Sequence, residues 1–105
     1  MWVKIFTSMV EARERVRVNT PQLLLIGEQR ITLVQTRKGF LAVQDFCTHN
    51  KESLSKGTVN YKDEIICPWH GYCFDLRTGR ESLERSADLK TYPVREEEGG
   101  LFIDL

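Results

Sequence analysis

The two histidines of this chain each lie beside a cysteine, in two short motifs. The first motif is Cys47-Thr48-His49, and the second is Cys67-Pro68-Trp69-His70. Seventeen residues separate the motifs, so each can form a loop of its own. The loops must fold side by side if the four side chains are to bind one metal centre. The motif pair therefore constrains the fold more than any other feature of the sequence.

Two thiolates and two imidazoles can hold a [2Fe–2S] cluster in which histidines replace two cysteines on one iron. Thiolates are soft donors that suit iron–sulfur centres, and imidazole suits iron as a neutral donor. With only two thiolates the oxidised cluster is close to neutral, so it accepts an electron more readily than a cluster with four. Mixed ligation therefore raises the reduction potential above that of plant-type ferredoxins. Such a centre transfers single electrons.

Two other interpretations of the motifs remain open. Two cysteines and two histidines also suit a tetrahedral structural zinc ion. Zinc motifs commonly keep the cysteines and the histidines in separate halves, whereas each half here mixes the two types. In the second alternative, the histidines are ordinary polar residues with hydrogen-bond partners and bind no metal.

Length and charge place limits on the class of protein. A chain of 105 residues fits a single domain over residues 1–105. Fifteen basic and fifteen acidic residues cancel, and no basic surface typical of nucleic-acid binding is expected. Three cysteines fit a disulfide framework poorly, which favours a reducing compartment. With no apolar run of membrane-spanning length and no signal peptide, we expect a soluble, cytoplasmic protein with no membrane partner.

Short apolar or alternating runs predict an all-β fold, an antiparallel sandwich or barrel with the two loops at one end. The cluster-binding part should span about residues 45–76. A capping box at Ser8–Glu11 predicts one short helix, and glycines favour hairpin turns at 37–39 and 97–100. The expected strands are Trp2–Phe6, Arg15–Val18, Gln22–Ile26, Arg30–Thr36, Phe40–Phe46, Glu64–Cys67, Tyr72–Leu76, Leu89–Val94 and Leu101–Leu105.

The region from about residue 40 to the end resembles the bacterial Rieske-type ferredoxins. Three segments carry the resemblance: Cys47-x-His49 with Leu54 and Gly57, the run from Cys67-Pro68-Trp69-His70-Gly71 to Thr78-Gly79, and Leu89-x-x-Tyr92-Pro93-Val94-Arg95. The resemblance implies three antiparallel sheets and one [2Fe–2S] cluster per chain. It also implies that Cys47 and Cys67 hold the inner iron, while His49 and His70 hold the outer iron through Nδ1.

The sequence departs from the family pattern at informative positions. Respiratory Rieske proteins have a disulfide between their two loops, but Glu52 and Trp69 stand at those positions here. Tyr72 and Phe74 replace a serine and a tyrosine that hydrogen-bond the cluster in those proteins, so a low potential near about −150 mV is expected. Lys51 replaces a frequent glycine, and the segment 85–87 lacks its usual proline.

Three residues beside the motifs have more than one interpretation. Trp69 and Tyr72 can either pack over the cluster or contact a partner protein, since aromatic residues are enriched in interfaces. Cys73 is the third thiol, and we expect it to pack as a small, buried apolar residue.

The sequence favours an electron carrier over an enzyme. A Rieske oxygenase needs a second iron site of two histidines and one carboxylate, and the chain has no histidines beyond His49 and His70. No GxGxxG fingerprint of a dinucleotide domain is present. We expect a monomeric ferredoxin that carries electrons from a flavin reductase to a terminal oxygenase. The alternatives are the small subunit of an NAD(P)H-dependent nitrite reductase, bound to its large subunit, and a zinc-stabilised interaction module.

Overall fold

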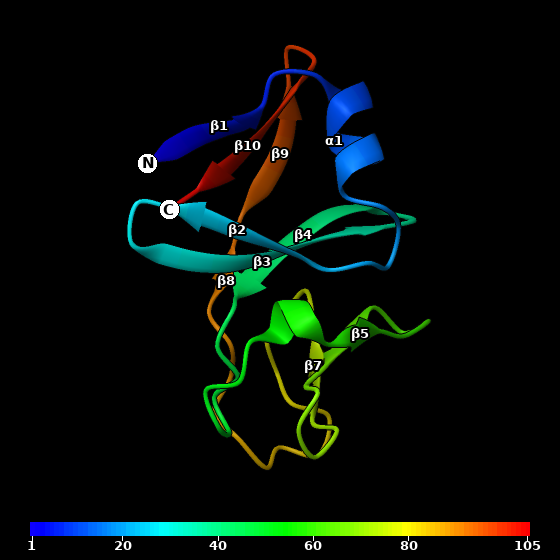
Figure 1. Cartoon of the computed structure of the whole chain (residues 1–105), viewed down its shortest axis with the longest axis vertical. Helices are drawn as coiled ribbons and strands as arrows, with labels where there is room; N and C mark the ends of the chain where they lie inside the picture. The colour runs from blue at the N-terminus through cyan, green and yellow to red at the C-terminus, as the bar shows by residue number, and fades with distance from the viewer.

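The computed structural model describes residues 1–105 and is mostly β-structure. Ten strands form three antiparallel sheets, with strand orders β1-β10-β9, β2-β3-β4-β8 and β5-β6-β7 (Figure 1). No helix is both long and apolar enough to cross a membrane. The elements are β1 Trp2–Phe6, α1 Met9–Arg15, β2 Gln22–Ile26, β3 Gln29–Thr36, β4 Gly39–Gln44, the 3-10 helix η1 Leu54–Lys56, β5 Thr58–Val59, β6 Glu64–Ile66, β7 Cys73–Asp75, β8 Thr91–Tyr92, β9 Val94–Glu97 and β10 Gly100–Asp104.

The first two sheets form the base of the molecule, and the third sheet lies below them (Figure 1). Strand β3 joins the two parts because both of its faces are buried. Ile31 and Leu33 belong to the apolar core of the base, which also includes residues of α1, β4 and β10. Val34 belongs to a second apolar core around the third sheet. The alternation of side chains in the sequence of this strand therefore corresponds to two cores on opposite faces.

The short helix α1 begins where the capping box predicts it. The hydroxyl of Ser8 accepts a hydrogen bond from the N–H of Glu11 at 3.4 Å. Met9 and Ala12 are the buried residues of the helix and pack in the core of the base. The strand expected at Arg15–Val18 is wrong, because Arg15 is the last residue of this helix. Val18 forms only an isolated bridge to Gln35. Helix packing explains the apolar residues of this segment, since buried Val16 caps the helix inside the core of the base.

The strand expected at Leu89–Val94 divides into two strands in different sheets. Residues Thr91–Tyr92 form β8 beside β4, whereas β9 begins at Val94 and pairs with β10. Pro93 lies between them and has no N–H to contribute to a ladder. The hairpin that follows turns at Glu98 and Gly99, whose φ angles are 51° and 77°. Positive φ at both central residues is typical of a type I′ turn. The hairpin turn itself lies where the glycines predicted it.

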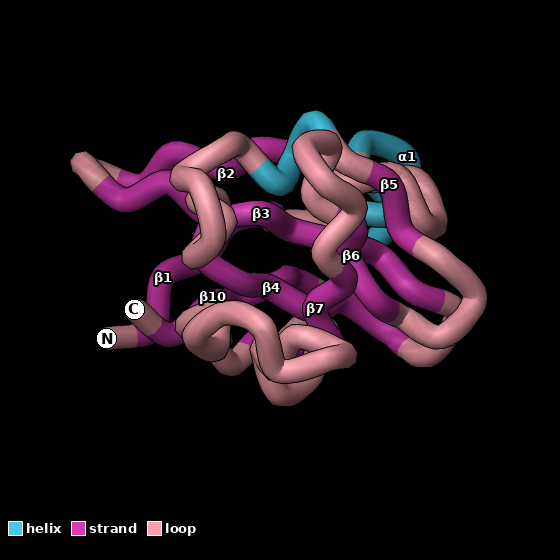
Figure 2. Tube along the Cα trace, turned by 90° about the horizontal axis from the view of Figure 1, so that it is seen from below, coloured by secondary structure: helices cyan, strands magenta, loops and turns pink.

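The third sheet supports the end of the molecule that carries both Cys/His motifs. Figure 2 views this end from below and shows that loops make up most of it, with β6 and β7 behind them. We name this end the tip; it comprises residues 45–90. The sequence predicted β6 and β7, but it missed η1 and the two-residue strand β5. Both missed elements are very short, and they lie between the two motifs.

Candidate metal centre

The two Cys/His motifs form loops with the same closure. The N–H of Cys47 donates to the carbonyl of Glu52 at 2.8 Å, five residues ahead. The N–H of Cys67 donates to the carbonyl of Tyr72, again five residues ahead and again at 2.8 Å. The first loop leads from β4 toward η1, and the second connects β6 to β7. Each loop therefore presents one cysteine and one histidine from a six-residue turn with a fixed base.

Both motif cysteines lie inside the second apolar core, and each is 1% exposed. Neither is in a disulfide. Burial, together with the neighbouring Cys47, raises the pKa of the Cys67 thiol to about 11. Two adjacent buried thiolates are unfavourable unless a cation is bound between them. A metal ion reverses this preference, since it binds thiolates and releases their protons.

Both motif histidines are exposed at the surface of the tip. Their ring centroids are 5.5 Å apart, and the ring planes are nearly perpendicular at 80°. His70 has a φ of 67° and Gly71 has a φ of 68°, so two consecutive left-handed residues turn the second loop. This turn brings the imidazole of His70 next to that of His49. Sulfur donors are thus buried and nitrogen donors are at the surface.

The four side chains fit a two-iron cluster as two pairs. No group of three or more His, Cys, Asp and Glu side chains lies close enough to hold a single metal ion. This spacing does not count against a [2Fe–2S] cluster, because each iron takes only two protein ligands and bridging sulfides supply the others. The amide of Asn50 lies beside the cysteines, with Oδ1 3.7 Å from Cys67 Sγ. Asn50 Nδ2 is buried without a hydrogen-bond partner, so the tip has a spare donor for a sulfur acceptor.

A buried carboxylate joins the first loop to the base of the molecule. Asp45 is 0% exposed and accepts hydrogen bonds from Thr32 Oγ1 at 2.8 Å, Ser53 Oγ at 2.7 Å and the N–H of Ser55 at 3.0 Å. Burial alone would raise the pKa of Asp45, but hydrogen bonds from Ser53 and Thr32 lower it overall. These contacts hold the segment on either side of the first loop against β3. Sequence analysis did not identify Asp45, which has no motif of its own.

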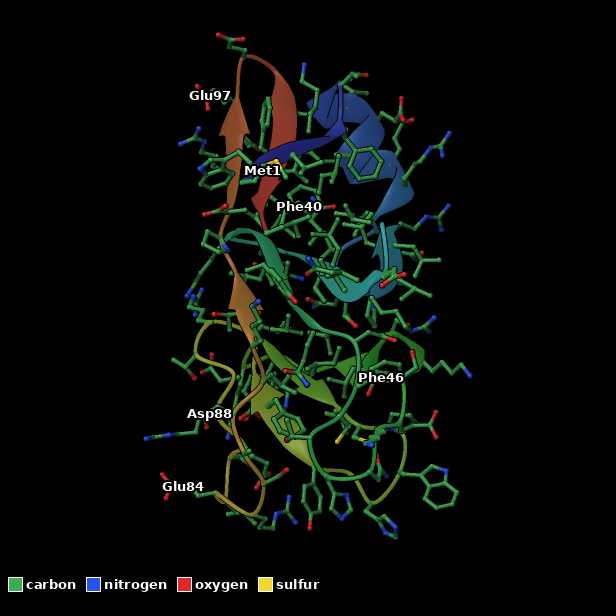
Figure 3. All side chains as sticks on the ribbon, turned by 90° about the vertical axis from the view of Figure 1, so that its left-hand side faces the viewer. Met1, Phe40, Phe46, Glu84, Asp88 and Glu97 are labelled. Carbon is green, nitrogen blue, oxygen red and sulfur yellow. The ribbon has the colours of Figure 1, made fainter.

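A segment after β7 covers the first loop. The hydroxyl of Thr48 donates to the carbonyl of Ala87 at 2.6 Å and lies 2.6 Å from the hydroxyl of Ser86. Figure 3 places Glu84 and Asp88 of this segment in the lower half of the molecule, opposite Glu97. Glu81 begins the segment and is fully buried. Hydrogen bonds from Arg85 lower the pKa of Glu81 to about 2.

The positions that depart from the family pattern have clear conformations. Lys51 has a φ of 60°, so the loop keeps the left-handed geometry that a glycine adopts without strain. Trp69 is 59% exposed, whereas Tyr72 stacks on the ring of His49. The structure therefore assigns surface exposure to Trp69 and packing over the site to Tyr72. Cys73 is only half-buried, and its thiol lies 3.4 Å from the carbonyl of Gly71.

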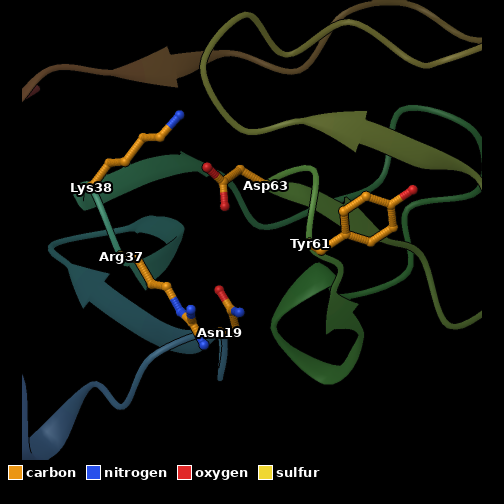
Figure 4. Close-up of a pocket in the computed structure, with 5 residues that line it drawn as sticks. All are labelled: Asn19, Arg37, Lys38, Tyr61 and Asp63. Atoms are coloured by element: carbon orange, nitrogen blue, oxygen red, sulfur yellow. The ribbon is translucent and has the colours of Figure 1, made fainter.

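A separate polar pocket lies away from the Cys/His loops (Figure 4). Its volume is about 310 Å³, and its lining consists of Asn19, Arg37, Lys38, Tyr61 and Asp63. None of the four motif residues lines it. The candidate metal centre is thus a surface tip with a buried sulfur side, rather than a pocket for a small molecule.

Comparison with known proteins identifies the class of protein that this fold and tip define. Residues 6–93 match the model of the Rieske [2Fe-2S] domain. The 3-phenylpropionate/cinnamic acid dioxygenase ferredoxin subunit of Escherichia coli K12 is 38% identical over 76 residues, 71% of this chain and 72% of that protein. The class is therefore an all-β iron–sulfur protein with a two-loop tip. The chain belongs to the Rieske [2Fe–2S] domain family.

Solved structures agree with this fold. The ferredoxin in the complex of reduced oxygenase and oxidised ferredoxin of carbazole 1,9a-dioxygenase superposes with a TM-score of 0.81 and 26% identity, over 97% of this chain and 100% of that one. A protein described as a nitrite reductase NADPH small subunit has a TM-score of 0.83 at 21% identity, over 100% of this chain and 99% of that one. At 21% identity, the similarity to this second protein indicates only that the two chains share a fold.

Proposed function

We propose that the protein is a Rieske-type ferredoxin that carries single electrons between partner proteins. Cys47 and Cys67 hold one iron, His49 and His70 hold the other, and each chain binds one [2Fe–2S] cluster. The observation that carries the proposal is the matched pair of loops, each of which presents one buried thiol and one exposed imidazole. The Rieske domain match supports the same cofactor.

The tip separates two tasks between its two kinds of ligand. When bound, the cluster accepts and releases one electron at a time. Cys47 and Cys67 lie among apolar side chains that exclude water from the sulfur side. His49 and His70 are exposed, so a partner that contacts the tip meets their ring edges directly. Exposed Trp69, next to His70, adds an aromatic contact at the same surface.

The electron acceptor that we propose is a terminal oxygenase. Two similarities support it: the 38% identity to a dioxygenase ferredoxin subunit, and the likeness to a ferredoxin solved together with its oxygenase. The donor in this proposal is a flavin reductase, and the carrier is a cytoplasmic monomer. The protein is not an enzyme in this scheme, because both of its histidines serve the cluster and none is left for a substrate-binding iron.

The small subunit of a nitrite reductase is the second candidate, because such a subunit has the same fold. At 21% identity that likeness says nothing of the partner. The greater identity to an oxygenase ferredoxin subunit over more than two thirds of both chains favours the ferredoxin.

Metal analysis and native gel filtration together test the proposal. Protein purified without oxygen should be red-brown and contain iron and acid-labile sulfide in equal amounts, two of each per chain. Stoichiometric zinc in a colourless protein would instead establish the zinc module. In native cell extract the ferredoxin should elute at the size of a free small domain. Stable co-elution with a large sirohaem-containing chain would establish the nitrite reductase subunit.

A further inference from the structure

Tyr72 of the second loop lies flat against the histidine of the first loop. The ring centroids of Tyr72 and His49 are 3.9 Å apart, and their planes differ by only 16°. The carbonyl of Tyr72 also closes the second loop by accepting the N–H of Cys67. The position of the ring is thus tied to the backbone of the motif that carries the other cysteine. Through this stack, the second loop fixes the orientation of a side chain on the first.

A guanidinium group lies over the same tyrosine ring. Arg85 Cζ is 3.9 Å from the ring centroid of Tyr72. The imidazole of His49 and this guanidinium are equally close to one centroid, so they must occupy opposite faces of the ring. The result is a three-layer stack of imidazole, phenol and guanidinium. The two stacking distances together place the cation within about one Debye length of the imidazole, roughly 8 Å at physiological ionic strength.

Glu81 holds the guanidinium in this orientation. Arg85 Nε donates to Glu81 Oε1 at 3.0 Å, and Arg85 Nη2 donates to Oε2 at 2.8 Å. Such a two-point contact fixes the plane of an arginine side chain. The carboxylate is itself fully buried and fixed by three backbone donors, the N–H groups of Leu83, Arg85 and Cys73. The carboxylate binds the edge of the guanidinium, so the cation rather than the anion lies against Tyr72.

We propose that Arg85 is a positioning residue that acts on His49 through Tyr72 and raises the reduction potential of the bound cluster. The inference rests on the proposed function, since it takes His49 as an iron ligand. The stack limits rotation of the imidazole, and the cation favours the state with the extra electron. Reduction takes the cluster from about neutral to one negative charge. Arg85 is paired with Glu81, so the pair acts as a dipole whose positive end lies against Tyr72 and stabilises the reduced product. Arg85 is 37% exposed, so solvent weakens this effect without removing it.

Four variants of the cluster-loaded protein separate the charge from the stack. Arg85→Gln removes the charge, whereas Arg85→Lys keeps a charge that can still pair with Glu81. Tyr72→Leu removes the aromatic ring, and Tyr72→Phe keeps it. Arg80→Gln is the matched control, because Arg80 directly precedes this segment, is exposed and forms an ion pair only with exposed Glu84. Each protein is analysed for iron and sulfide, for midpoint potential by voltammetry, and for histidine nitrogen couplings by pulsed EPR of the reduced state.

The expected result is a lower potential in two of the variants. Arg85→Gln and Tyr72→Leu should decrease the equilibrium constant for reduction by roughly three- to tenfold, a shift of up to about 59 mV. Tyr72→Leu should also alter the histidine nitrogen couplings. Tyr72→Phe and Arg80→Gln should match the unchanged protein in both measurements, and Arg85→Lys should keep most of its potential.

The outcomes distinguish this inference from the proposed function. If the unchanged protein bound no iron and sulfide, the proposed function would fail, and this inference with it. If the cluster were present but Arg85→Gln and Tyr72→Leu both kept the potential of Arg80→Gln, the inference alone would be overturned. If Arg85→Gln failed to fold, the contrast between Tyr72→Leu and Tyr72→Phe would decide in the same way.

Discussion

The hydroxyl of Ser53 donates a 2.7 Å hydrogen bond to the carboxylate of Asp45, which is completely buried. The two residues flank the first Cys/His loop, and Asp45 also accepts from Thr32 on β3. The sheet of the base is therefore connected to the candidate metal centre through one carboxylate. Loss of that carboxylate leaves several polar donors buried without an acceptor.

We expect Asp45→Ala to lower the free energy of unfolding of the apoprotein by about 2–4 kcal/mol, since buried donors without partners are costly. Urea denaturation followed by circular dichroism measures this change. Asp88→Ala is the control, because Asp88 is exposed in the same end of the molecule, and a surface change of this kind stays within about 0.5 kcal/mol. Equal stabilities for the two variants would show that Asp45 does not connect the loop to the base.

The ligand assignment predicts a difference between the three cysteines. Cys47→Ser or Cys67→Ser should lose the cluster, because each change removes a thiolate from the metal. Cys73→Ser should keep it, because Cys73 lies in β7, outside the two closed loops. Iron and sulfide content with the visible spectrum gives the result. Loss of colour in Cys73→Ser alone would show that the ligands were wrongly chosen.

The low pKa of Glu81 predicts how the stability of the apoprotein depends on pH. Hydrogen bonds from Arg85 lower the pKa of Glu81 to about 2 in the folded state, and an unfolded glutamate has a pKa of about 4.3. Between these values the unfolded chain binds more protons, so stability rises with pH. The contribution of Glu81 is therefore complete above about pH 5 and is lost as the pH falls toward 2.

Denaturation of the apoprotein and of Glu81→Gln across pH 2–7 tests this expectation. The stability difference between the two should be largest near neutral pH and should shrink in acid. A stability difference that stayed constant from pH 7 to pH 2 would show that ionisation of the Glu81 carboxylate does not contribute to the stability of the folded protein.

Patterns with a physical cause in the local sequence predicted most of the fold. The helix that begins after Ser8 follows from the capping box. The turn at Glu98–Gly99 follows from a glycine at a position with positive φ. The family resemblance implied three antiparallel sheets, and the topology confirms them. By contrast, Val16 and Val18 alternate like a strand, yet Val16 packs as the end of a helix. Only the tertiary core could decide between the two.

The contacts around the candidate metal centre were the least predictable part of the structure. The motif residues were apparent because cysteine and histidine are scarce in this chain. Asp45 and Glu81 were not apparent, since acidic residues are common and their burial depends on partners distant in the sequence. The stack on His49 involves Arg85, thirty-six residues further along the chain. No local pattern predicts such a contact.

The conformation of Lys51 predicts a stabilising substitution. Its φ of 60° lies in the left-handed region, which costs a residue with a side chain about 1 kcal/mol. Lys51→Gly removes that strain but adds entropy to the unfolded chain, so the net gain should be about 0.5 kcal/mol. Thermal unfolding should shift upward by roughly 2–4 °C. Lys56→Gly, in η1, should shift it downward, and a decrease for both would refute the argument.

The last prediction concerns the midpoint potential. Phe74 has no hydroxyl, and the ring of Tyr72 lies against His49, so we expect neither residue to repeat the hydroxyl contacts to sulfur of the respiratory proteins. A hydrogen bond to a charged group contributes about 1.5–3 kcal/mol. Without such bonds the potential should lie at the low end of the Rieske range, about −150 mV or modestly above.

Protein-film voltammetry of the cluster-loaded protein measures this potential. A midpoint above about +150 mV would contradict the expectation that no hydroxyl group donates to the cluster.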